Sequence, residues 1–333
     1  MNIVEQIVSG DIRATARLLR DIDDEIPSAR DILRELYPHT GNAFVIGFTG
    51  SPGVGKSALV DQLTTYYRKA GKTIGILAVD PTSPFTGGAL LGDRIRMQRH
   101  FMDSGVFIRS LATRGHFGGL SKSTGDMVNV LDAAGKEVII IETVGVGQDE
   151  VEIVNSAHTT VLVTVPGMGD DIQAIKAGTM EIGDIFVVNK ADRDGSRKTA
   201  RELMNLVELG AKKRNGDDWE PQILETEATT PKGIGRLYEV IEQHRNYLLT
   251  ANAERWRQIL QRRAKIHLVG TLKDQALRML IERIEAHGDY LDEMVRKIVE
   301  KESDPYTIAQ QIIDRELSWG RQTADGAAEP LAK

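Results

Sequence analysis

The sequence predicts an α/β protein built on a doubly wound, mainly parallel sheet with helical extensions at both ends. Short apolar runs rich in β-branched residues recur from residue 43 onward. They are continuous rather than alternating, which is typical of strands buried on both faces. Helical or glycine-rich stretches separate them, as crossovers between parallel strands do. The predicted strands lie at 43–49, 73–79, 106–111, 137–143, 160–165, 185–190 and, more weakly, 222–226.

Helices are predicted at both ends of the chain. The first forty residues contain two predicted helices, the second of which begins with Pro27, a residue tolerated in a first helical turn. After about residue 235 the strand pattern stops, and apolar spacings of three and four at 272–280 and 291–298 predict a helical appendage. This appendage either packs on the core or forms a dimerisation arm. Residues 321–333 are predicted to be a frayed tail.

These patterns divide the chain into three parts. We expect an N-terminal helical extension over 1–42, a central domain over 43–248, and a C-terminal helical arm with its tail over 249–333. Parallel sheets of this kind bind ligands at the carboxyl ends of their strands. We therefore expect the ligand-binding and catalytic residues in the central domain.

Composition excludes several classes of partner. The 333 residues are 41% apolar and 27% charged with a net charge of −6, which argues against a general nucleic-acid binder. There is no cysteine, so neither a disulfide framework nor a thiolate metal site is available. The N-terminus carries Glu5 and has no long apolar stretch, so we expect neither a signal peptide nor a membrane anchor. We expect a cytoplasmic protein with no nucleic-acid or membrane partner.

Residues 50–57, GSPGVGKS, match the phosphate-loop pattern G-x-x-x-x-G-K-[ST] at every fixed position. Glycines allow backbone N–H groups to surround phosphate oxygens, Lys56 reaches the outer phosphates, and the Ser57 hydroxyl ligates Mg²⁺. A predicted strand precedes the motif and a helical pattern follows it, which is the context that the motif requires. The predicted phosphate-binding residues are Gly53, Val54, Gly55, Lys56, Ser57 and Ala58.

A second motif identifies the base. Asn189, Lys190 and Asp192 form N-K-x-D at the end of an apolar strand. A carboxylate there can accept hydrogen bonds from guanine N1–H and the 2-amino group, which adenine does not supply. The predicted nucleotide is therefore GTP or GDP. The backbone N–H near Ala228 is a further candidate donor to the base, because residues 226–237 stand where another base-contacting loop would come.

Two strand-terminal carboxylates are candidate metal ligands. Asp80 and Glu142 each end a predicted strand, where they can hold Mg²⁺ directly or through water. Glu142 opens ETVGVGQ, which resembles the D-x-x-G of GTPases with Gly145 placed to sense the γ-phosphate. Gln148 follows that glycine by three residues, so the sequence shows no glutamine placed to orient the attacking water. Slow intrinsic hydrolysis that needs a partner or a rearrangement follows as a hypothesis.

Two further segments carry candidate residues. Asp93 lies among arginines after a Pro/Gly-rich loop, where arginine can clamp phosphate, although a solvated helix face would have the same composition. Lys176 follows Gly167 and Gly169, which suit either a mobile loop or a turn before an ordinary helix.

The succession GSPGVGKS, AVDPTSPFTGGALLGDRIRM, ETVGVGQ, GDDIQAIKAG and NKAD resembles the MeaB/ArgK/MMAA GTPases. These are G-protein chaperones of adenosylcobalamin-dependent acyl-CoA mutases. The resemblance covers about residues 8–315, and its most specific part is the joined signature at 79–97 together with ETVGVGQ. It implies a P-loop GTPase domain of the SIMIBI class that assembles as a homodimer through the C-terminal arm.

The resemblance also implies partners and roles. Family members bind methylmalonyl-CoA mutase or a close relative, gate transfer of adenosylcobalamin into it from an adenosyltransferase, and help to exclude damaged cofactor. Adenosylcobalamin is thus expected only through the partner. Segment 167–178 would be a third switch that responds to the mutase, with Lys176 as a candidate partner-activated group. The implied phosphate and Mg²⁺ residues are Lys56, Ser57, Asp80, Asp93 and Glu142, and the implied guanine-reading residues are Asn189, Lys190 and Asp192.

Three other functions are compatible with parts of this sequence. A nickel-insertion GTPase shares the nucleotide fold, but its metal relay usually relies on cysteine and histidine, and this chain has no cysteine. A P-loop kinase linked to basic amino-acid transport would require ATP preference, whereas NKAD favours guanine. A nucleotide-dependent scaffold without turnover conflicts with the intact Lys56 and Ser57, while the displaced Gln148 is compatible with it.

Overall fold

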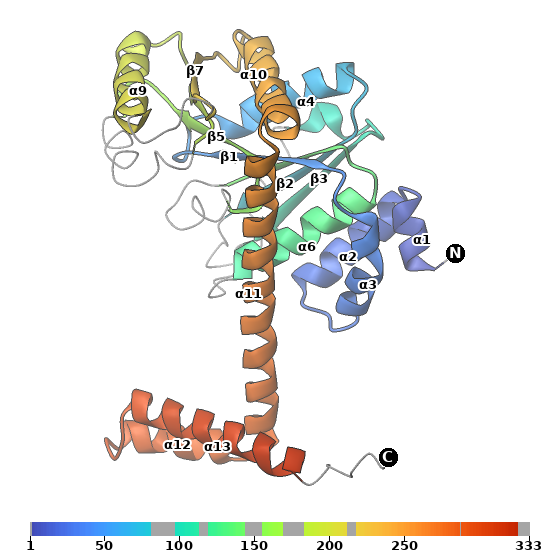
Figure 1. Cartoon of the computed structure of the whole chain (residues 1–333), viewed down its shortest axis with the longest axis vertical. Coiled ribbons are helices and arrows are strands. Elements are labelled where there is room, and N and C mark those ends of the chain that lie inside the picture. Colours follow the sequence, from blue (N-terminus) through green and yellow to red (C-terminus); the bar gives the residue numbers. More distant parts are fainter. Residues whose placement is uncertain are drawn as a thin grey trace. The chain divides into compact units, whose positions relative to one another are not determined.

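The described part of the chain forms one seven-stranded sheet in which all strands are parallel (Figure 1). The computed structural model describes residues 2–80, 97–112, 119–143, 155–168, 183–211, 218–286 and 288–325. The predicted fold class and all seven predicted strands are confirmed, and the order across the sheet is β3-β2-β4-β1-β5-β6-β7. The strands are β1 (Phe44–Thr49), β2 (Ile74–Asp80), β3 (Val106–Ala112), β4 (Val138–Glu142), β5 (Thr159–Thr164), β6 (Ile185–Val188) and β7 (Gln222–Glu225).

The sheet is buried because helices cover both of its faces. Every residue of β1, β4, β5 and β6 is buried, which explains why these strands are continuous apolar runs. On one face, Val45, Leu77 and Ile139 pack in a cluster with the N-terminal helices and α6 (Gly119–Ala133). On the opposite face, Ile46 and Ile140 pack with α4 (Lys56–Lys69) and α10 (Ile234–Asn246). Towards the β7 edge of the sheet, α9 (Ser196–Ala211) packs over Phe186 of β6.

The strand order creates a switch point beside β1. The chain leaves β1 through α4 towards β2 on one side, whereas it leaves β4 for β5 on the other side of β1. The connections after β1 and β4 therefore diverge at the carboxyl edge of the sheet, and the crevice formed in this way is where ligands bind in doubly wound folds. The phosphate loop follows β1 directly and so occupies this crevice.

The N-terminal segment forms three helices rather than the predicted two. They are α1 (Ile3–Val8), α2 (Ile12–Asp23) and α3 (Ala29–Leu36). The break between α1 and α2 arises because Gly10 adopts φ 84° and the Asp11 side chain accepts a hydrogen bond from the Ala14 N–H at 2.8 Å, capping a new helix. Pro27 also lies two residues before α3 rather than in its first turn.

The C-terminal helices are confirmed as helices, and the chain divides into two compact units, Met1–His267 and Leu268–Lys333. The division of the sequence at residues 42 and 248 remains a prediction. The second unit has its own small core of Ile284, Met294, Ile308 and Ile312. Contrary to the predicted frayed tail from residue 321, helix continues to Asp325. The helices are α11 (Ala253–Glu285), α12 (Tyr290–Val299) and α13 (Pro305–Asp325).

Within the described ranges, every helix is too short or too polar to cross a bilayer. Two 3-10 turns and one π-helical segment join the longer elements; they are η1 (Tyr37–His39), η2 (Gln98–His100) and η4 (Tyr247–Ala251).

Candidate nucleotide-binding site

Glycine is required at two positions of the phosphate loop for steric reasons. Gly50 has φ 135°, and a Cβ there would overlap the Val163 carbonyl oxygen of the neighbouring strand β5. Gly55 has φ 95°, and its Cβ would lie 2.5 Å from Nδ2 of Asn189. Gly53 also has a positive φ of 79°, but a Cβ there would meet nothing within 4 Å. The loop is therefore held tightly against β5 and Asn189.

Substitution of Gly50 by alanine is expected to destabilise the fold more than substitution of Gly53. Both substitutions place a side chain at positive φ, but only Gly50→Ala also drives it into rigid backbone. We expect the free energy of unfolding to fall by at least about 2 kcal/mol more for Gly50→Ala. Urea unfolding of the two variants measures the difference, and equal losses would contradict the close packing of Gly50 on β5.

The lysine of the phosphate loop is buried. Lys56 is only 6% exposed. Its ammonium group donates hydrogen bonds to the Ser51 carbonyl oxygen at 3.0 Å and to the Gly50 carbonyl oxygen. The cation thus lies within the curve of the loop, where its charge and the backbone N–H groups attract the same anion.

Ser57 and Glu142 meet at the base of the same crevice. Ser57 Oγ donates a hydrogen bond to Oε1 of Glu142 at 2.6 Å, although the two residues are 85 positions apart. Both side chains are buried, with Ser57 6% and Glu142 5% exposed. The first turn of α4 supplies the hydroxyl, and the last residue of β4 supplies the carboxylate. The fold thus brings together two side chains that the sequence offers separately as candidate Mg²⁺ ligands.

This pair has the donor chemistry that Mg²⁺ prefers. A hydroxyl and a carboxylate oxygen are hard ligands, and Mg²⁺ usually takes one or two protein groups plus phosphate oxygens and water. Asp80 ends β2, whose Ala78 is in register with Glu142 on β4, so its backbone lies at the same edge of the sheet. Among the described residues, no group of three or more Asp, Glu or His side chains is clustered for a metal. The site therefore suits a metal shared with a phosphate ligand, whose negative charge the ion would neutralise.

Asn189 links three loops of the site. It is 1% exposed, and its Nδ2 donates to the Val54 carbonyl oxygen of the phosphate loop at 2.8 Å. Its Oδ1 accepts from Thr226 Oγ1 at 3.1 Å and from the Ala228 N–H at 3.3 Å. The N–H predicted as a base donor at Ala228 is therefore directed at Asn189 here. Thr226 is a residue that the sequence reasoning missed; its only signal was a hydroxyl directly after β7.

The other residues of the second motif lie beside the phosphate loop. Lys190 has φ 56°, and its Nζ donates to the Gly53 carbonyl oxygen at 2.7 Å. Asp192 is exposed two residues further on. The pKa of Lys232 is raised, chiefly by its hydrogen bond and ion pair with Glu227 at 2.7 Å and to a smaller extent by the charges of Glu225 and Asp192. Asp192 thus presents a carboxylate at the rim of the site.

The structure brings some predicted site residues together and does not describe others. Lys56, Ser57 and Glu142 converge at the crevice, and Asn189 with Lys190 joins the phosphate loop from β6. The candidate metal residue Asp93 and the segments with Gly145, Gln148 and Lys176 lie outside the described residues, as does the side chain of Asp80.

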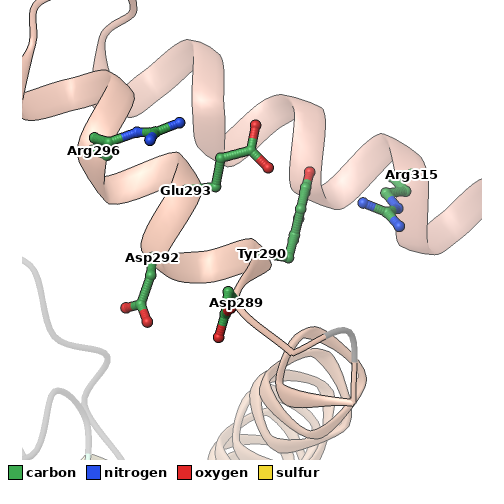
Figure 2. A pocket seen from close by; sticks show the side chains of 6 residues that line it. All are labelled: Asp289, Tyr290, Asp292, Glu293, Arg296 and Arg315. Carbon is green, nitrogen blue, oxygen red and sulfur yellow. The ribbon is translucent and has the colours of Figure 1, made fainter.

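A separate hollow of about 650 Å³ lies in the second unit, between α12 and α13 (Figure 2). The guanidinium carbon of Arg315 lies 4.3 Å from the centre of the Tyr290 ring, a cation–π contact that joins the two helices. Glu293 forms an ion pair with Lys297 at 2.9 Å. Tyr290, Glu293 and Arg315 at this hollow are thus already engaged in helix–helix or intrahelical contacts.

The fold and the crevice together define a P-loop nucleotide-binding protein. Comparison with known proteins identifies the family. The family described as "Methylmalonyl Co-A mutase-associated GTPase MeaB" matches residues 15–285. The chain belongs to the MeaB family and is a GTPase.

Individual relatives agree with this assignment. A protein of Pyrococcus abyssi that is named as a GTPase is 49% identical over 321 residues, covering 96% of this chain and 97% of the relative. "GTPase ArgK" of Escherichia coli is 34% identical over 260 residues, covering 78% of this chain and 77% of the relative. The solved structure of an "LAO/AO transport system kinase" superimposes with a TM-score of 0.64 at 23% identity, covering 95% of this chain and 96% of that one. This last likeness shows the fold alone.

Proposed function

We propose that this GTPase is a chaperone that gates adenosylcobalamin loading into methylmalonyl-CoA mutase or a closely related acyl-CoA mutase, and that it protects or reactivates that mutase. The observation that carries the proposal is the family match over 15–285, because it spans the phosphate loop, Glu142 and the N-K-x-D motif in one continuous stretch. GTP or GDP and Mg²⁺ would be its own ligands, and adenosylcobalamin would be met only through the mutase. A cobalamin adenosyltransferase is a further proposed partner.

The observed geometry supports specific roles in nucleotide binding. The backbone of Gly53–Ala58 would hold the phosphates, with Lys56 compensating their charge. Ser57 and Glu142, already in contact, would hold Mg²⁺ together with Asp80 and Asp93. For guanine recognition we propose Asn189, Lys190, Asp192 and Ala228, with Gly145 sensing the γ-phosphate.

Control of GTP hydrolysis by a partner is proposed because the sequence has no glutamine directly after Gly145. Gln148 stands three residues after Gly145, so no glutamine is placed in the sequence to orient the attacking water. We therefore propose slow intrinsic hydrolysis, accelerated when the mutase orders the 167–178 segment over the nucleotide. Thermodynamic linkage requires the converse, that the bound nucleotide changes the affinity for the mutase.

The test of this proposal is the GTPase rate with and without a purified adenosylcobalamin-dependent acyl-CoA mutase. We expect stimulation of the wild type, and a smaller stimulation with unchanged basal rate for Lys176→Ala, because this lysine would stabilise charge on the phosphates only in the complex. Lys198→Ala, an exposed lysine on α9, is the matched control. Equal stimulation of Lys176→Ala would remove Lys176 from the mechanism, and absence of stimulation by any such mutase would overturn the chaperone function.

We propose that the active form is a cytoplasmic homodimer assembled through the C-terminal helices. Leu291, Val295 and Val299 recur every four residues on α12, and they are 46%, 49% and 72% exposed. An apolar stripe of this kind, outside the core of Met294 and Ile308, suits contact with a second chain. The stripe supports the dimer independently of the nucleotide site.

The alternative functions predict different measurements. A kinase linked to basic amino-acid transport, the role in the name of the superimposed structure, would prefer ATP and transfer phosphate to an acceptor. A metal-insertion GTPase would need a metal relay, and this chain has no cysteine. A scaffold would bind GTP without turnover. Nucleotide preference and turnover measured on one preparation, followed by mutase addition, separate all three from the proposed chaperone.

A further inference from the structure

The turn between β7 and α10, residues 227–232, is closed on itself by backbone hydrogen bonds. The Glu227 N–H donates to the Lys232 carbonyl oxygen at 3.0 Å, and the two residues form an isolated β-bridge. Between them, the Thr230 N–H donates to the Glu227 carbonyl oxygen at 3.2 Å. The two ends of the 227–232 turn therefore lie side by side before α10 begins.

One carboxylate binds two other side chains of this turn. Oε1 of Glu227 accepts a hydrogen bond from Lys232 Nζ at 2.7 Å, and Oε2 accepts one from Thr230 Oγ1 at 2.9 Å. The Glu227 side chain is 13% exposed, whereas Lys232 is exposed. The hydrogen bond from Lys232, followed by that from Thr230, lowers the pKa of Glu227, so the carboxylate is charged at pH 7. Each oxygen of Glu227 thus holds a different residue of the turn.

Ala228 is the most buried residue of the 227–232 turn, at 5% exposed. Its N–H is directed at Oδ1 of Asn189 at 3.3 Å, which is longer than a typical N–H···O hydrogen bond. The same Oδ1 accepts a hydrogen bond from Thr226 Oγ1 at 3.1 Å, so Asn189 keeps a partner when the Ala228 N–H donates elsewhere. The turn therefore carries a backbone donor that can serve a second acceptor beside Asn189.

The backbone on either side of the turn is fixed by the sheet. The Thr226 N–H donates to the Val188 carbonyl oxygen of β6 at 2.9 Å. Gly233, which follows the turn, has φ 77°, and a Cβ there would overlap the Glu225 carbonyl oxygen of β7. Inside the turn, both of the described side-chain hydrogen bonds end on Glu227. The conformation of the turn between its fixed ends thus depends on this one side chain.

We propose that Glu227 is a positioning residue for guanine recognition: by holding Thr230 and Lys232 it keeps the turn in the conformation in which the Ala228 N–H donates to O6 of guanine. This inference rests on the proposed role of Ala228 in reading the base. Guanine O6 is an acceptor, whereas adenine carries an amino donor at that position, so a fixed N–H distinguishes the two bases. A turn that is ordered before the nucleotide arrives loses little conformational entropy on binding, which favours GTP.

Calorimetry on the full chain tests the proposal with GTP and with the triphosphate of 2-aminopurine riboside, which has no O6. We expect Glu227→Ala to weaken GTP binding by roughly three- to tenfold, the contribution of one neutral hydrogen bond, and to leave binding of the 2-aminopurine nucleotide unchanged. A general loss of structure would weaken both nucleotides alike. Glu227→Gln, which still offers an amide oxygen to Lys232, should recover part of the loss. Glu239→Ala is the matched control, because Glu239 is an exposed residue of α10 that pairs with Arg236 at 3.1 Å.

A second variant separates loss of the turn from release of Lys232, because Asp192 is near enough to interact electrostatically with that lysine. If the released ammonium group blocked Asp192, Glu227→Ala/Lys232→Ala would regain GTP affinity, whereas we expect the double variant to stay weak.

The preference of the wild type for GTP over ATP, measured in the same samples, tests guanine recognition itself. Wild-type GTP affinity in Glu227→Ala, equal weakening of both nucleotides, or recovery in the double variant would overturn the role of Glu227 and leave guanine recognition intact. Equal affinity of the wild type for GTP and ATP would overturn both.

Discussion

Replacement of Lys56 by alanine is expected to lower the rate of GTP hydrolysis by roughly 10²–10³-fold or more. The ammonium group lies inside the phosphate loop, where it donates to the Ser51 carbonyl oxygen and where the β- and γ-phosphates would accept from it. Its charge would stabilise negative charge that develops on the phosphates in the transition state. A single-turnover assay with saturating GTP and Mg²⁺ measures the loss independently of any change in affinity.

Because Lys56 is buried, the experiment must separate a loss of protein stability from a loss of catalysis. Because the side chain is 6% exposed, truncation removes packed methylene groups as well as the charge, and a loss of stability on the order of 1–3 kcal/mol is expected. Lys56→Met keeps most of the stem and should hydrolyse GTP as poorly as the alanine variant while melting closer to the wild type. Lys69→Ala, an exposed lysine at the end of α4, is the matched surface control. A well-folded Lys56 variant that hydrolyses GTP at the wild-type rate would disprove the phosphate-loop assignment.

The second large effect is expected at Asp192. GTP and GDP should bind at least about tenfold more tightly than ATP, because the carboxylate accepts hydrogen bonds from guanine and would be left unpaired against adenine. Asp192→Asn should relax this preference towards xanthine nucleotides, whose 2-oxo group needs a donor. Asp192 is exposed at the rim, so the substitution should leave folding intact.

Calorimetry with GTP, ATP and the xanthine triphosphate measures the change in preference. Asp194→Asn, an equally exposed carboxylate two residues further on, should bind all three nucleotides as the wild type does. Equal affinity of the wild-type protein for GTP and ATP would refute guanine recognition by this motif. It would also favour the kinase alternative.

Local patterns in the sequence were sufficient for the sheet and the phosphate loop. Continuous apolar runs predicted seven strands, because a strand covered by helices on both faces needs apolar residues at every position. The motif at 50–57 predicted a turn between β1 and α4, because its glycines allow a backbone path that other residues resist. The N-terminal helix count was wrong, because the break depends on one capping side chain at Asp11, a signal easily lost within an amphipathic pattern.

The sequence by itself therefore determined the class of fold, and it predicted the phosphate loop and the guanine motif, because the residues of each motif are neighbours in the chain. Only the tertiary structure decided which distant groups meet: Ser57 with Glu142, and Asn189 with Thr226. These contacts depend on strand order and on which helix covers which edge of the sheet. Hydrogen bonding between such groups leaves no periodic trace in the chain, because each partner is chosen by position in space rather than by spacing in sequence.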